Sequence, residues 1–398
     1  IYGPFSSLND KQEVAISQDG QKEAMEHAGR TGGLPFVGVG WYRTEFDVPQ
    51  FQAGKRATIL FDGAMSHANV YINGQKVGYW PYGYNSFHFD ITKYLKPGEK
   101  NTLAVRLENL PESSRWYPGA GLYRNVHLII TEDAYIPVWG TYITTPSVNE
   151  KFAKVNVRTK VVLPEGADPA KYSVETSVWN PNKQKLTAVR TSLAQMKYNN
   201  NQAEQEFVIQ APSLWSPEMP ALYSAETRLY EGDKLKDIYT TPFGIRSIEI
   251  IPDKGFFLNG KRTVFKGVCN HHDLGPLGAA VNDAAIRRQI RILKDMGCNA
   301  IRTSHNMPAP ELIRACDEMG MMIMAESFDE WNVAKCKNGY NLLFDEWAEK
   351  DLVNLLHNFR NNPSVVMWCI GNEVPNQWNE GDCKIAKWLQ DICHREDP

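Results

Sequence analysis

Apolar and polar residues alternate in short runs through the first third of the chain. Residues 41–46, 57–61 and 68–72 each follow a period of two, the pattern of a strand with one buried face. The third run leads directly into Asn73-Gly74, a pair that favours a tight hairpin because both residues tolerate positive φ. Many such short segments with little helix predict a β-sandwich of the jelly-roll type over residues 1–134.

A second β-rich stretch occupies residues 135–248. Valine alternates with polar residues at Val155 and Val157, and again at Val174 and Val178. About 110 residues with this alternation match the size of an immunoglobulin-like β-sandwich. The sequence therefore predicts a second all-β domain directly after the first.

The pattern changes after Gly255, where strand-like and helix-like segments alternate. The expected strands cover 263–268, 298–303, 321–325 and 365–370, and the expected helices cover 283–296, 310–319, 344–359 and 383–394. Because parallel strands need helical crossovers, this order predicts a parallel sheet. A closed (β/α)8 TIM barrel needs eight such units over about 250 residues. Residues 249–398 contain four, so we expect an incomplete barrel, its N-terminal half.

The amino-acid composition argues against several classes of function. The 43 Lys and Arg against 46 Asp and Glu leave a net charge of −3, which gives no electrostatic case for binding nucleic acid or an anionic membrane. No apolar run approaches the ~18 residues of a membrane helix. The seven Cys have neither CxxC nor zinc-type spacing, so they predict isolated thiols. The 11 Trp and 17 Tyr suit β-sheet cores or, alternatively, flat polar ligands such as sugars.

Polar side chains follow each expected strand of the last region. These residues are His271, His272 and Asp273 after the first strand; Arg302, Ser304, His305 and Asn306 after the second; Glu326, Asp329 and Glu330 after the third; and Asn372 and Glu373 after the fourth. The C-terminal ends of parallel strands meet on one rim, where barrel enzymes place their chemistry. One such residue is usually satisfied by local hydrogen bonds, whereas four coincident clusters indicate a site.

The rim lacks the signatures of several common enzyme classes. The chain has no GxSxG motif, no HExxH zinc helix and no glycine-rich phosphate loop. His271-His272-Asp273 fits no common metal site, because adjacent residues of a strand point to opposite faces. A rim rich in carboxylates, His and Asn suits glycoside hydrolysis, which needs one protonated and one ionised carboxyl group.

Five motifs, in order along the chain, resemble glycoside hydrolase family 2. They lie at residues 38–43, 215–223, 243–246, 302–308 and 371–373. That family includes β-galactosidases, β-glucuronidases and β-mannosidases, and the resemblance covers nearly the whole chain. It implies a jelly roll, an immunoglobulin-like domain and a TIM barrel in that order. It also implies retaining hydrolysis of a terminal β-linked sugar, with a carbohydrate as the partner and homo-oligomerisation left open.

The resemblance also implies roles for individual residues. Glu373 matches the general acid and base, and Asn372 matches the residue that hydrogen-bonds the sugar 2-hydroxyl. Arg302 matches the residue that orients the nucleophilic carboxylate and keeps it ionised. His271 and His305 match positions that line the sugar subsite.

Glu330 matches a residue near the substrate that binds Mg²⁺ in some β-galactosidases. Asn332 stands where those enzymes have His, so no metal or other cofactor is expected to be required. The segments 270–275 and 326–331 resemble β-galactosidase-like bacterial members more than β-glucuronidases. The resemblance therefore favours a β-galactoside substrate.

The nucleophile of the family is a Glu on a later barrel strand. Only Glu380 and Glu396 follow Glu373, and both lie beside or after the last expected helix, so neither matches. We expect the nucleophile to lie beyond Pro398 and the 398-residue chain alone to be inactive. The alternatives are a β-glucuronidase or β-mannosidase of the same family, or a non-catalytic carbohydrate-binding protein that lacks the second carboxylate.

Overall fold

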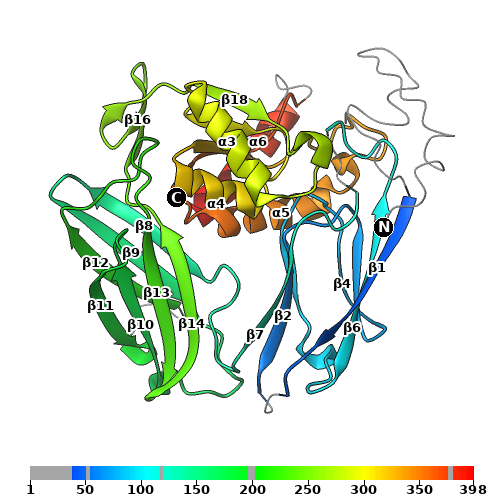
Figure 1. Cartoon of the computed structure of the whole chain (residues 1–398), viewed down its shortest axis with the longest axis horizontal. Coiled ribbons are helices and arrows are strands. Elements are labelled where there is room, and N and C mark those ends of the chain that lie inside the picture. The colour runs from blue at the N-terminus through cyan, green and yellow to red at the C-terminus, as the bar shows by residue number, and fades with distance from the viewer. Residues whose placement is uncertain (1–37, 51–53, 117–119, 196–201, 375–379) are drawn as a thin grey trace.

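The computed structural model describes residues 38–50, 54–116, 120–195, 202–374 and 380–398. Two β-sandwiches both contact an α/β region, which lies above them in Figure 1. The predicted first domain includes residues 1–37, which lie outside the described part. The order of two β-sandwiches followed by an α/β region confirms the predicted fold class.

The first sandwich consists of two antiparallel sheets of order β1-β6-β3-β4 and β5-β2-β7. Its elements are β1 (Gly38–Asp47), β2 (Arg56–Phe61), β3 (Ala68–Ile72), β4 (Gln75–Trp80), β5 (Phe87–Asp90), the 3-10 helix η1 (Thr92–Tyr94), β6 (Lys100–Asn109) and β7 (Val126–Thr131). Phe61 and Phe87 are fully buried, and their stacked rings have centroids 5.0 Å apart. Asn73 and Gly74 have φ of 51° and 81°, so the predicted hairpin joins β3 to β4.

The second sandwich pairs a sheet of order β12-β9-β8 with one of order β11-β10-β13-β14. Its elements are β8 (Thr141–Val148), β9 (Phe152–Lys160), η2 (Pro169–Lys171), β10 (Tyr172–Trp179), β11 (Lys185–Ser192), η3 (Leu193–Gln195), β12 (Gln202–Gln210), β13 (Tyr223–Glu231) and β14 (Lys234–Phe243). The alternating Val155, Val157, Val174 and Val178 are all fully buried, so they form the inner faces of the sandwich. This arrangement is immunoglobulin-like.

A small antiparallel sheet precedes the barrel, and it corrects the predicted start of the first barrel strand. The sheet contains β15 (Ile248–Ile251), β16 (Gly255–Leu258) and β17 (Lys261–Arg262). The strand expected at 263–268 begins later, as β18 (Gly267–Asn270). Val264 and Phe265 are exposed, and the Asn299 side chain hydrogen-bonds the Val264 carbonyl at 2.9 Å. This apolar run therefore lies outside the sheet that it was expected to enter.

Four parallel strands in chain order form the α/β region, which is an incomplete barrel as predicted. It contains β18, η4 (Gly275–Leu277), α3 (Asp283–Asp295), β19 (Ala300–Thr303), α4 (Pro310–Met319), β20 (Met322–Glu326), η5 (Tyr340–Leu342), α5 (Phe344–Phe359), β21 (Val365–Cys369) and α6 (Glu380–Glu396). The Asn282 side chain caps α3, which buries Ile286, Ile290 and Leu293 as its apolar pattern predicts. Among the described helices, none is long and apolar enough to cross a membrane.

The first sandwich is fastened to the α/β region at Asp351 on α5. This carboxyl group is fully buried and accepts hydrogen bonds from Trp80 Nε1 (2.8 Å), Asn85 Nδ2 (2.8 Å) and Tyr340 Oη (2.5 Å). Burial raises the pKa of Asp351 to about 6, although these neutral donors oppose the shift. The junction is therefore held by hydrogen bonds to a carboxyl group that has no cation as a direct partner in these contacts.

The second sandwich joins the α/β region through two of the motifs that carry the family resemblance. The fully buried Trp215 donates Nε1–H to the Asp317 carbonyl at 2.9 Å. Arg246 donates to the carbonyls of Pro363 (2.7 Å) and Val365 (2.6 Å), directly before and within β21. A side chain on Gly244 would lie 2.5 Å from Pro363 Cβ, so this glycine permits the close approach. These two motifs therefore hold the second sandwich against α4 and against β21, the strand that leads to Asn372 and Glu373.

Candidate active site

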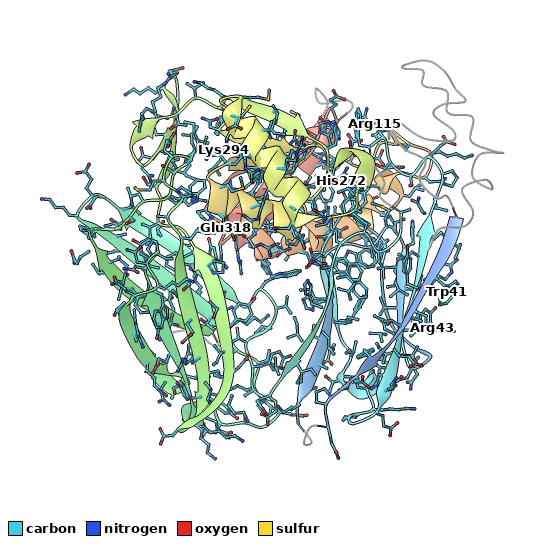
Figure 2. The ribbon with its side chains drawn as sticks, in the orientation of Figure 1. Trp41, Arg43, Arg115, His272, Lys294 and Glu318 are labelled. Carbon is cyan, nitrogen blue, oxygen red and sulfur yellow. The ribbon has the colours of Figure 1, made fainter. Side chains whose placement is uncertain are left out.

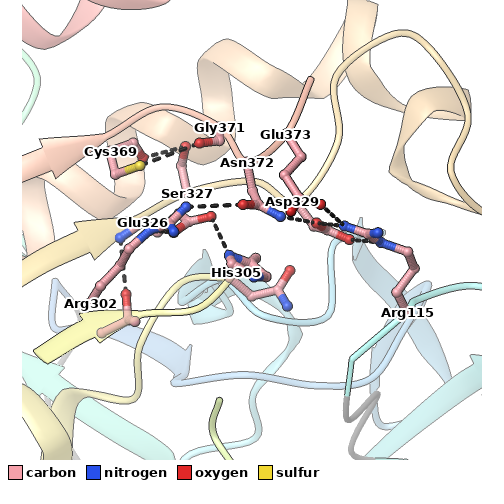
Figure 3. A network of polar contacts seen from close by, with 12 residues as sticks. Arg115, Arg302, His305, Glu326, Ser327, Asp329, Cys369, Gly371, Asn372 and Glu373 are labelled. Atoms are coloured by element: carbon pink, nitrogen blue, oxygen red, sulfur yellow. Dashed lines mark hydrogen bonds and ion pairs between the residues drawn. The ribbon is translucent and has the colours of Figure 1, made fainter. Parts of the chain in front are cut away.

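The four parallel strands are neighbours in one sheet, and Figure 3 shows residues from the C-terminal ends of β19, β20 and β21 close together, as the sequence predicts. Arg302 lies within β19 and His305 follows it, Glu326 ends β20, and Asn372 and Glu373 follow β21. His271 follows β18, and its ring lies 5.2 Å from that of His305. Five of the six predicted site residues, all except Glu330, are thus brought to one rim.

Glu326 is the buried hub of the rim. Its carboxylate is fully buried and lies 2.5 Å from Arg302 Nε and 3.0 Å from His305 Nδ1. Its backbone N–H donates to Thr303 Oγ1 at 2.9 Å. An unpaired buried carboxylate is strongly unfavourable, so the two partners compensate it while Glu326 holds their orientation. Sequence reasoning placed Glu326 in the cluster but gave it no role.

Asn372 bridges two charged residues across the rim. Its Oδ1 accepts from Arg302 Nη2 at 3.1 Å, and its Nδ2 donates to Asp329 Oδ1 at 2.9 Å. These two contacts define which end of the amide is the donor. An amide nitrogen carries two N–H groups, so one is available for a ligand hydroxyl. The buried amide is therefore presented in one fixed orientation.

Glu373 differs from the other rim carboxylates because 74% of its side chain is exposed. Its backbone has φ of 41°, a conformation that is uncommon for a residue other than glycine and that recurs at functional sites. The preceding Gly371 allows the Trp331 indole to pack closely, since a Cβ there would lie 2.6 Å from Trp331 Nε1. Trp331 Nε1 in turn donates to the Ile370 carbonyl at 2.8 Å. The end of β21 is thus shaped to turn Glu373 outward.

Asp329 joins the rim to the first sandwich. Arg115 binds it with two hydrogen bonds, Nε to Oδ2 at 2.9 Å and Nη2 to Oδ1 at 2.7 Å (Figure 3). Lys335 Nζ lies 3.3 Å from Asp329 Oδ1 and also donates to the carbonyls of Asp329 (2.6 Å) and Asn372 (2.5 Å). Burial alone would raise the pKa of Asp329, but hydrogen bonds from Arg115 and Asn372 and the Lys335 charge outweigh it and hold that pKa below its usual value.

Aromatic rings form one wall of the rim. The Trp116 ring lies 4.4 Å from the His271 ring at an interplanar angle of 31°, and 5.8 Å from the His305 ring. His272 points the other way and packs edge-on against Tyr84, with centroids 4.9 Å apart. Burial and the neighbouring His305 lower the pKa of His271 to about 4, so His271 is neutral at neutral pH.

Sequence reasoning did not identify Arg115, Trp116 or Lys335 as site residues. Figure 2 shows Arg115 where the first sandwich meets the α/β region, on the chain that follows β6. Arg115 is 214 residues from Asp329, and no periodicity relates the two positions. Lys335 is nearer, six residues after Asp329, but it lies in a segment without regular structure. The adjacent Arg115 and Trp116 were the one sequence feature that could have indicated a site here. Their role becomes visible only when the first sandwich is docked against the α/β region.

Glu330, the sixth predicted site residue, serves a neighbouring loop. Its carboxylate accepts the backbone N–H groups of Lys335 (2.6 Å) and Asn341 (3.3 Å), and burial raises its pKa. A side chain at Gly339 would displace the Glu330 carboxylate, because its Cβ would overlap Glu330 Oε1. Each oxygen of Glu330 accepts a backbone N–H, and Asn332 stands where the Mg²⁺-binding β-galactosidases have His; that no metal is required stays a prediction. A role for Glu330 in binding sugar stays a prediction.

Of the four acidic residues Glu326, Asp329, Glu330 and Glu373, only Glu373 presents a carboxylate that is mostly exposed to solvent. Glu326, Asp329 and Glu330 are buried carboxylates engaged by cations or backbone amides, whereas Glu373 presents an exposed carboxylate beside a fixed amide. In the described part of the chain, no group of three or more His, Cys, Asp and Glu side chains gathers to hold a metal ion. The rim therefore offers an acid or base at Glu373 next to hydrogen-bonding groups suited to hydroxyls.

A jelly roll, an immunoglobulin-like sandwich and parallel barrel strands with an Asn-Glu pair at one rim are the features that the resemblance to glycoside hydrolase family 2 implies. Three models of glycosyl hydrolases family 2 match the chain in order: the sugar binding domain over residues 35–132, the family 2 domain over 135–246 and the TIM barrel domain over 249–397. The chain belongs to glycoside hydrolase family 2. This confirms the resemblance on which the sequence analysis relied.

Individual relatives point to more than one sugar. A β-galactosidase of Bacteroides ovatus is 45% identical over 354 residues, covering 89% of this chain and 42% of that protein. A putative β-glucuronidase of Formosa agariphila is 38% identical over 348 residues, covering 87% and 33%. A crystal structure of a family 2 member from Bacteroides cellulosilyticus superposes with a TM-score of 0.88 at 36% identity, covering 94% and 48%. The chain thus spans less than half the length of each.

Proposed function

We propose that this chain is part of a retaining exo-β-glycosidase that releases terminal, non-reducing β-D-galactosyl groups. Glu373 is the acid and base, and the nucleophile is a Glu on a later barrel strand, outside these 398 residues. In the first step Glu373 protonates the leaving oxygen while the nucleophile attacks the anomeric carbon. In the second step Glu373 takes a proton from water, which releases the sugar with its original configuration.

The observation that carries this proposal is the environment of Glu373. It has the exposed carboxylate of the rim, and it follows an amide that Arg302 and Asp329 hold in one orientation. A general acid must reach the leaving oxygen, which requires exposure toward the substrate. The adjacent Asn372 N–H is available for the sugar 2-hydroxyl, a contact that strengthens in the transition state.

The cations of the rim support a neutral sugar. Arg115 and Lys335 lie beside Asn372 and Glu373, and Asp329 engages both of them. A uronic acid brings its own carboxylate and would have to compete with Asp329 for these cations. The resemblance of the strand-end motifs to β-galactosidases points in the same direction, as does the name of the Bacteroides ovatus relative.

A β-glucuronidase is the second candidate. The observation in its favour is that the rim contains two cations, Arg115 and Lys335, in addition to Arg302. The Formosa agariphila relative named a putative β-glucuronidase also supports it. The two candidates differ in whether Arg115 and Lys335 stay with Asp329 or turn to a substrate carboxylate.

The test uses the full-length gene product and the 4-nitrophenyl β-galactoside, β-glucuronide and β-mannoside. We expect the highest kcat/KM on the galactoside, with the β-anomer of galactose formed first in proton NMR. Preference for the glucuronide would replace the first candidate with the second. Release of the α-anomer would contradict retention, and no turnover of any substrate would favour the non-catalytic alternative.

Replacing Glu373 tests its role directly. Glu373→Gln keeps the size of the side chain but removes the proton donor, so kcat/KM on phenyl β-galactoside should fall by about 10²–10⁴-fold. Added azide, which needs no general base, should restore turnover of an activated dinitrophenyl galactoside and yield galactosyl azide. The matched control is Glu165→Gln on an exposed loop of the second sandwich. Equal activity of the two variants would refute the assignment of Glu373.

A further inference from the structure

The segment that follows β6 brings a cation to the rim from a different domain. Arg115 is largely covered, with 18% of its side chain exposed, and its Nη2 lies 3.5 Å from Glu373 Oε2. The same nitrogen donates to Asp329 Oδ1 at 2.7 Å. One guanidinium therefore touches a buried carboxylate and the exposed carboxylate of Glu373.

Arg115 is itself held firmly. Its planar fork makes two hydrogen bonds to Asp329, and its cation lies 5.5 Å from the centre of the Trp116 ring. Asp329 is fastened in turn by Asn372 Nδ2 and Lys335 Nζ. The guanidinium is consequently a fixed point on the rim and not a freely rotating surface charge.

With the residues that the structure describes, the carboxylate of Glu373 makes fewer contacts than the buried carboxylates of the rim. Glu326, Asp329 and Glu330 are buried and each is bound by two or more groups, whereas the side chain of Glu373 is mostly exposed. In the described part of the chain, Arg115 is its ion-pair partner. The orientation of the Glu373 carboxylate therefore depends on Arg115.

We propose that Arg115 is a positioning residue that acts through Glu373, holding its carboxylate in the orientation needed for proton transfer to the leaving oxygen. This inference rests on the proposed function. The proton moves from Glu373 to the leaving oxygen in the first step and from water to Glu373 in the second. Arg115 stays protonated throughout, because its hydrogen bonds to Asp329 raise its pKa further above its usual range.

Leaving-group dependence separates this role from direct sugar binding. Protonation matters for a poor leaving group such as phenol, and matters little for 2,4-dinitrophenol, which leaves as a stable anion. Loss of positioning should thus slow the phenyl substrate selectively. Loss of a contact with the sugar ring, or of folding, would slow both substrates by the same factor, because both carry the same sugar.

The experiment compares wild-type full-length protein with Arg115→Met and Arg115→Lys. Met keeps an apolar stem without the charge, and Lys keeps the charge without the planar fork. For Arg115→Met we expect kcat/KM on phenyl β-galactoside to fall about 100-fold and that on 2,4-dinitrophenyl β-galactoside to fall less than about threefold. Arg115→Lys should show the same selectivity with a smaller loss.

The matched control is Arg43→Met. Arg43 is an exposed arginine of β1 in the same sandwich, and Figure 2 shows it well away from Arg115. Its replacement should leave both kcat/KM values unchanged. Thermal melting of each variant reports whether the fold is intact, and Arg115→Lys provides the comparison if Arg115→Met melts early.

A selective loss on the phenyl substrate supports the inference. An equal loss on both substrates, or no loss on either, overturns the role of Arg115 while the wild-type activity still supports the proposed function. A wild-type protein that turns over no β-glycoside would refute the proposed function and, with it, this inference. The two failures are therefore distinguishable in the same set of measurements.

Discussion

Two buried aspartates fasten the first sandwich to the α/β region, and they do so by opposite means. Asp351 on α5 receives hydrogen bonds from the neutral side chains of Trp80, Asn85 and Tyr340. Asp329, at the rim, is bound by the cations of Arg115 and Lys335. Both carboxyl groups are removed from water at the same domain boundary. Their partners differ in charge, and so do their pKa values.

The pKa of Asp351 is raised to about 6 because burial disfavours its charged form more than neutral donors favour it. The pKa of Asp329 is lowered although burial opposes this, because two cations and an amide stabilise its charged form. At Asp351 the contacts come from neutral hydrogen-bond donors, whereas at Asp329, beside Glu373, they include two full positive charges. Of these two aspartates, the one with charged partners is Asp329, which lies next to Glu373 in the candidate site.

Removing the charge of Asp329 should have the largest effect on stability. Asp329→Asn takes the shared carboxylate away from the largely covered Arg115 and Lys335, so we expect the free energy of unfolding to fall by about 3–5 kcal/mol at pH 7. Urea unfolding of the full-length protein measures this loss. The folded pKa of Asp329 is lowered, so its contribution is present above pH ~4 and is lost as pH falls further, through the folded pKa.

Asp283→Asn is the matched control for Asp329→Asn. Asp283, like Asp329, pairs with two cations, here Arg287 at 2.7 Å and Arg314 at 3.0 Å, but its side chain is 44% exposed. Exposed ion pairs contribute about 0–1 kcal/mol, so this variant should lose little stability. Equal losses for the two variants would show that burial does not distinguish the two clusters.

Asp351→Asn should reveal the opposite pH dependence. The folded pKa of about 6 lies above the ordinary value of 3.8, so the protonated form is the one that folding favours. The contribution of Asp351 is therefore complete below pH ~4 and is lost as pH rises to about 6. The stability advantage of wild type over Asp351→Asn should shrink across this range by on the order of 3 kcal/mol. Comparison with wild type cancels the titration of other groups.

Urea unfolding at pH 4, 5, 6 and 7 checks this dependence. An advantage that stays constant with pH would mean that the neutral donors fully offset the effect of burial on the pKa of Asp351. An advantage that grows with pH would mean that the folded pKa of Asp351 is lowered, as that of Asp329 is, and would remove the contrast between the two aspartates.

The smallest expected effect comes from one donor to Asp351. Trp80→Phe keeps an aromatic ring against Phe87, whose centroid is 5.5 Å away, but removes the 2.8 Å hydrogen bond to Asp351. We expect a loss of about 1–2 kcal/mol in urea unfolding at pH 7. Trp41→Phe, on a ring that is 53% exposed, should change stability by no more than about 0.5 kcal/mol. A similar loss of stability in both variants would show that the hydrogen bond from Trp80 to Asp351 does not stabilise the protein measurably.

Local patterns predicted much of the fold because the forces behind them are local. The Asn73-Gly74 hairpin depends on two residues that accept positive φ, and the buried face of α3 follows from its helical spacing. The strand expected at 263–268 was wrong because Val264 and Phe265 resemble a buried strand by composition. Their actual place depends on Asn299, whose side chain holds this segment outside the sheet.

The candidate site also has one part that the sequence predicted and one part that depends on tertiary contacts. The rim residues of the parallel strands could be listed in advance, since strand order brings their ends together. Their pairing could not. Arg302 was expected to face the nucleophile, and the structure pairs it with Glu326 and Asn372. Its action on a nucleophile stays a prediction.

The sequence by itself determined the order of two β-sandwiches and a parallel α/β region, and it put Asn372 and Glu373 at a strand end. Those features follow from periodicity and chain direction. Only the tertiary structure decided that Arg115 reaches Asp329 and Glu373, because domain docking joins residues far apart in the chain. No local preference encodes such a contact, since its free energy depends on which buried charges the docked domains bring together.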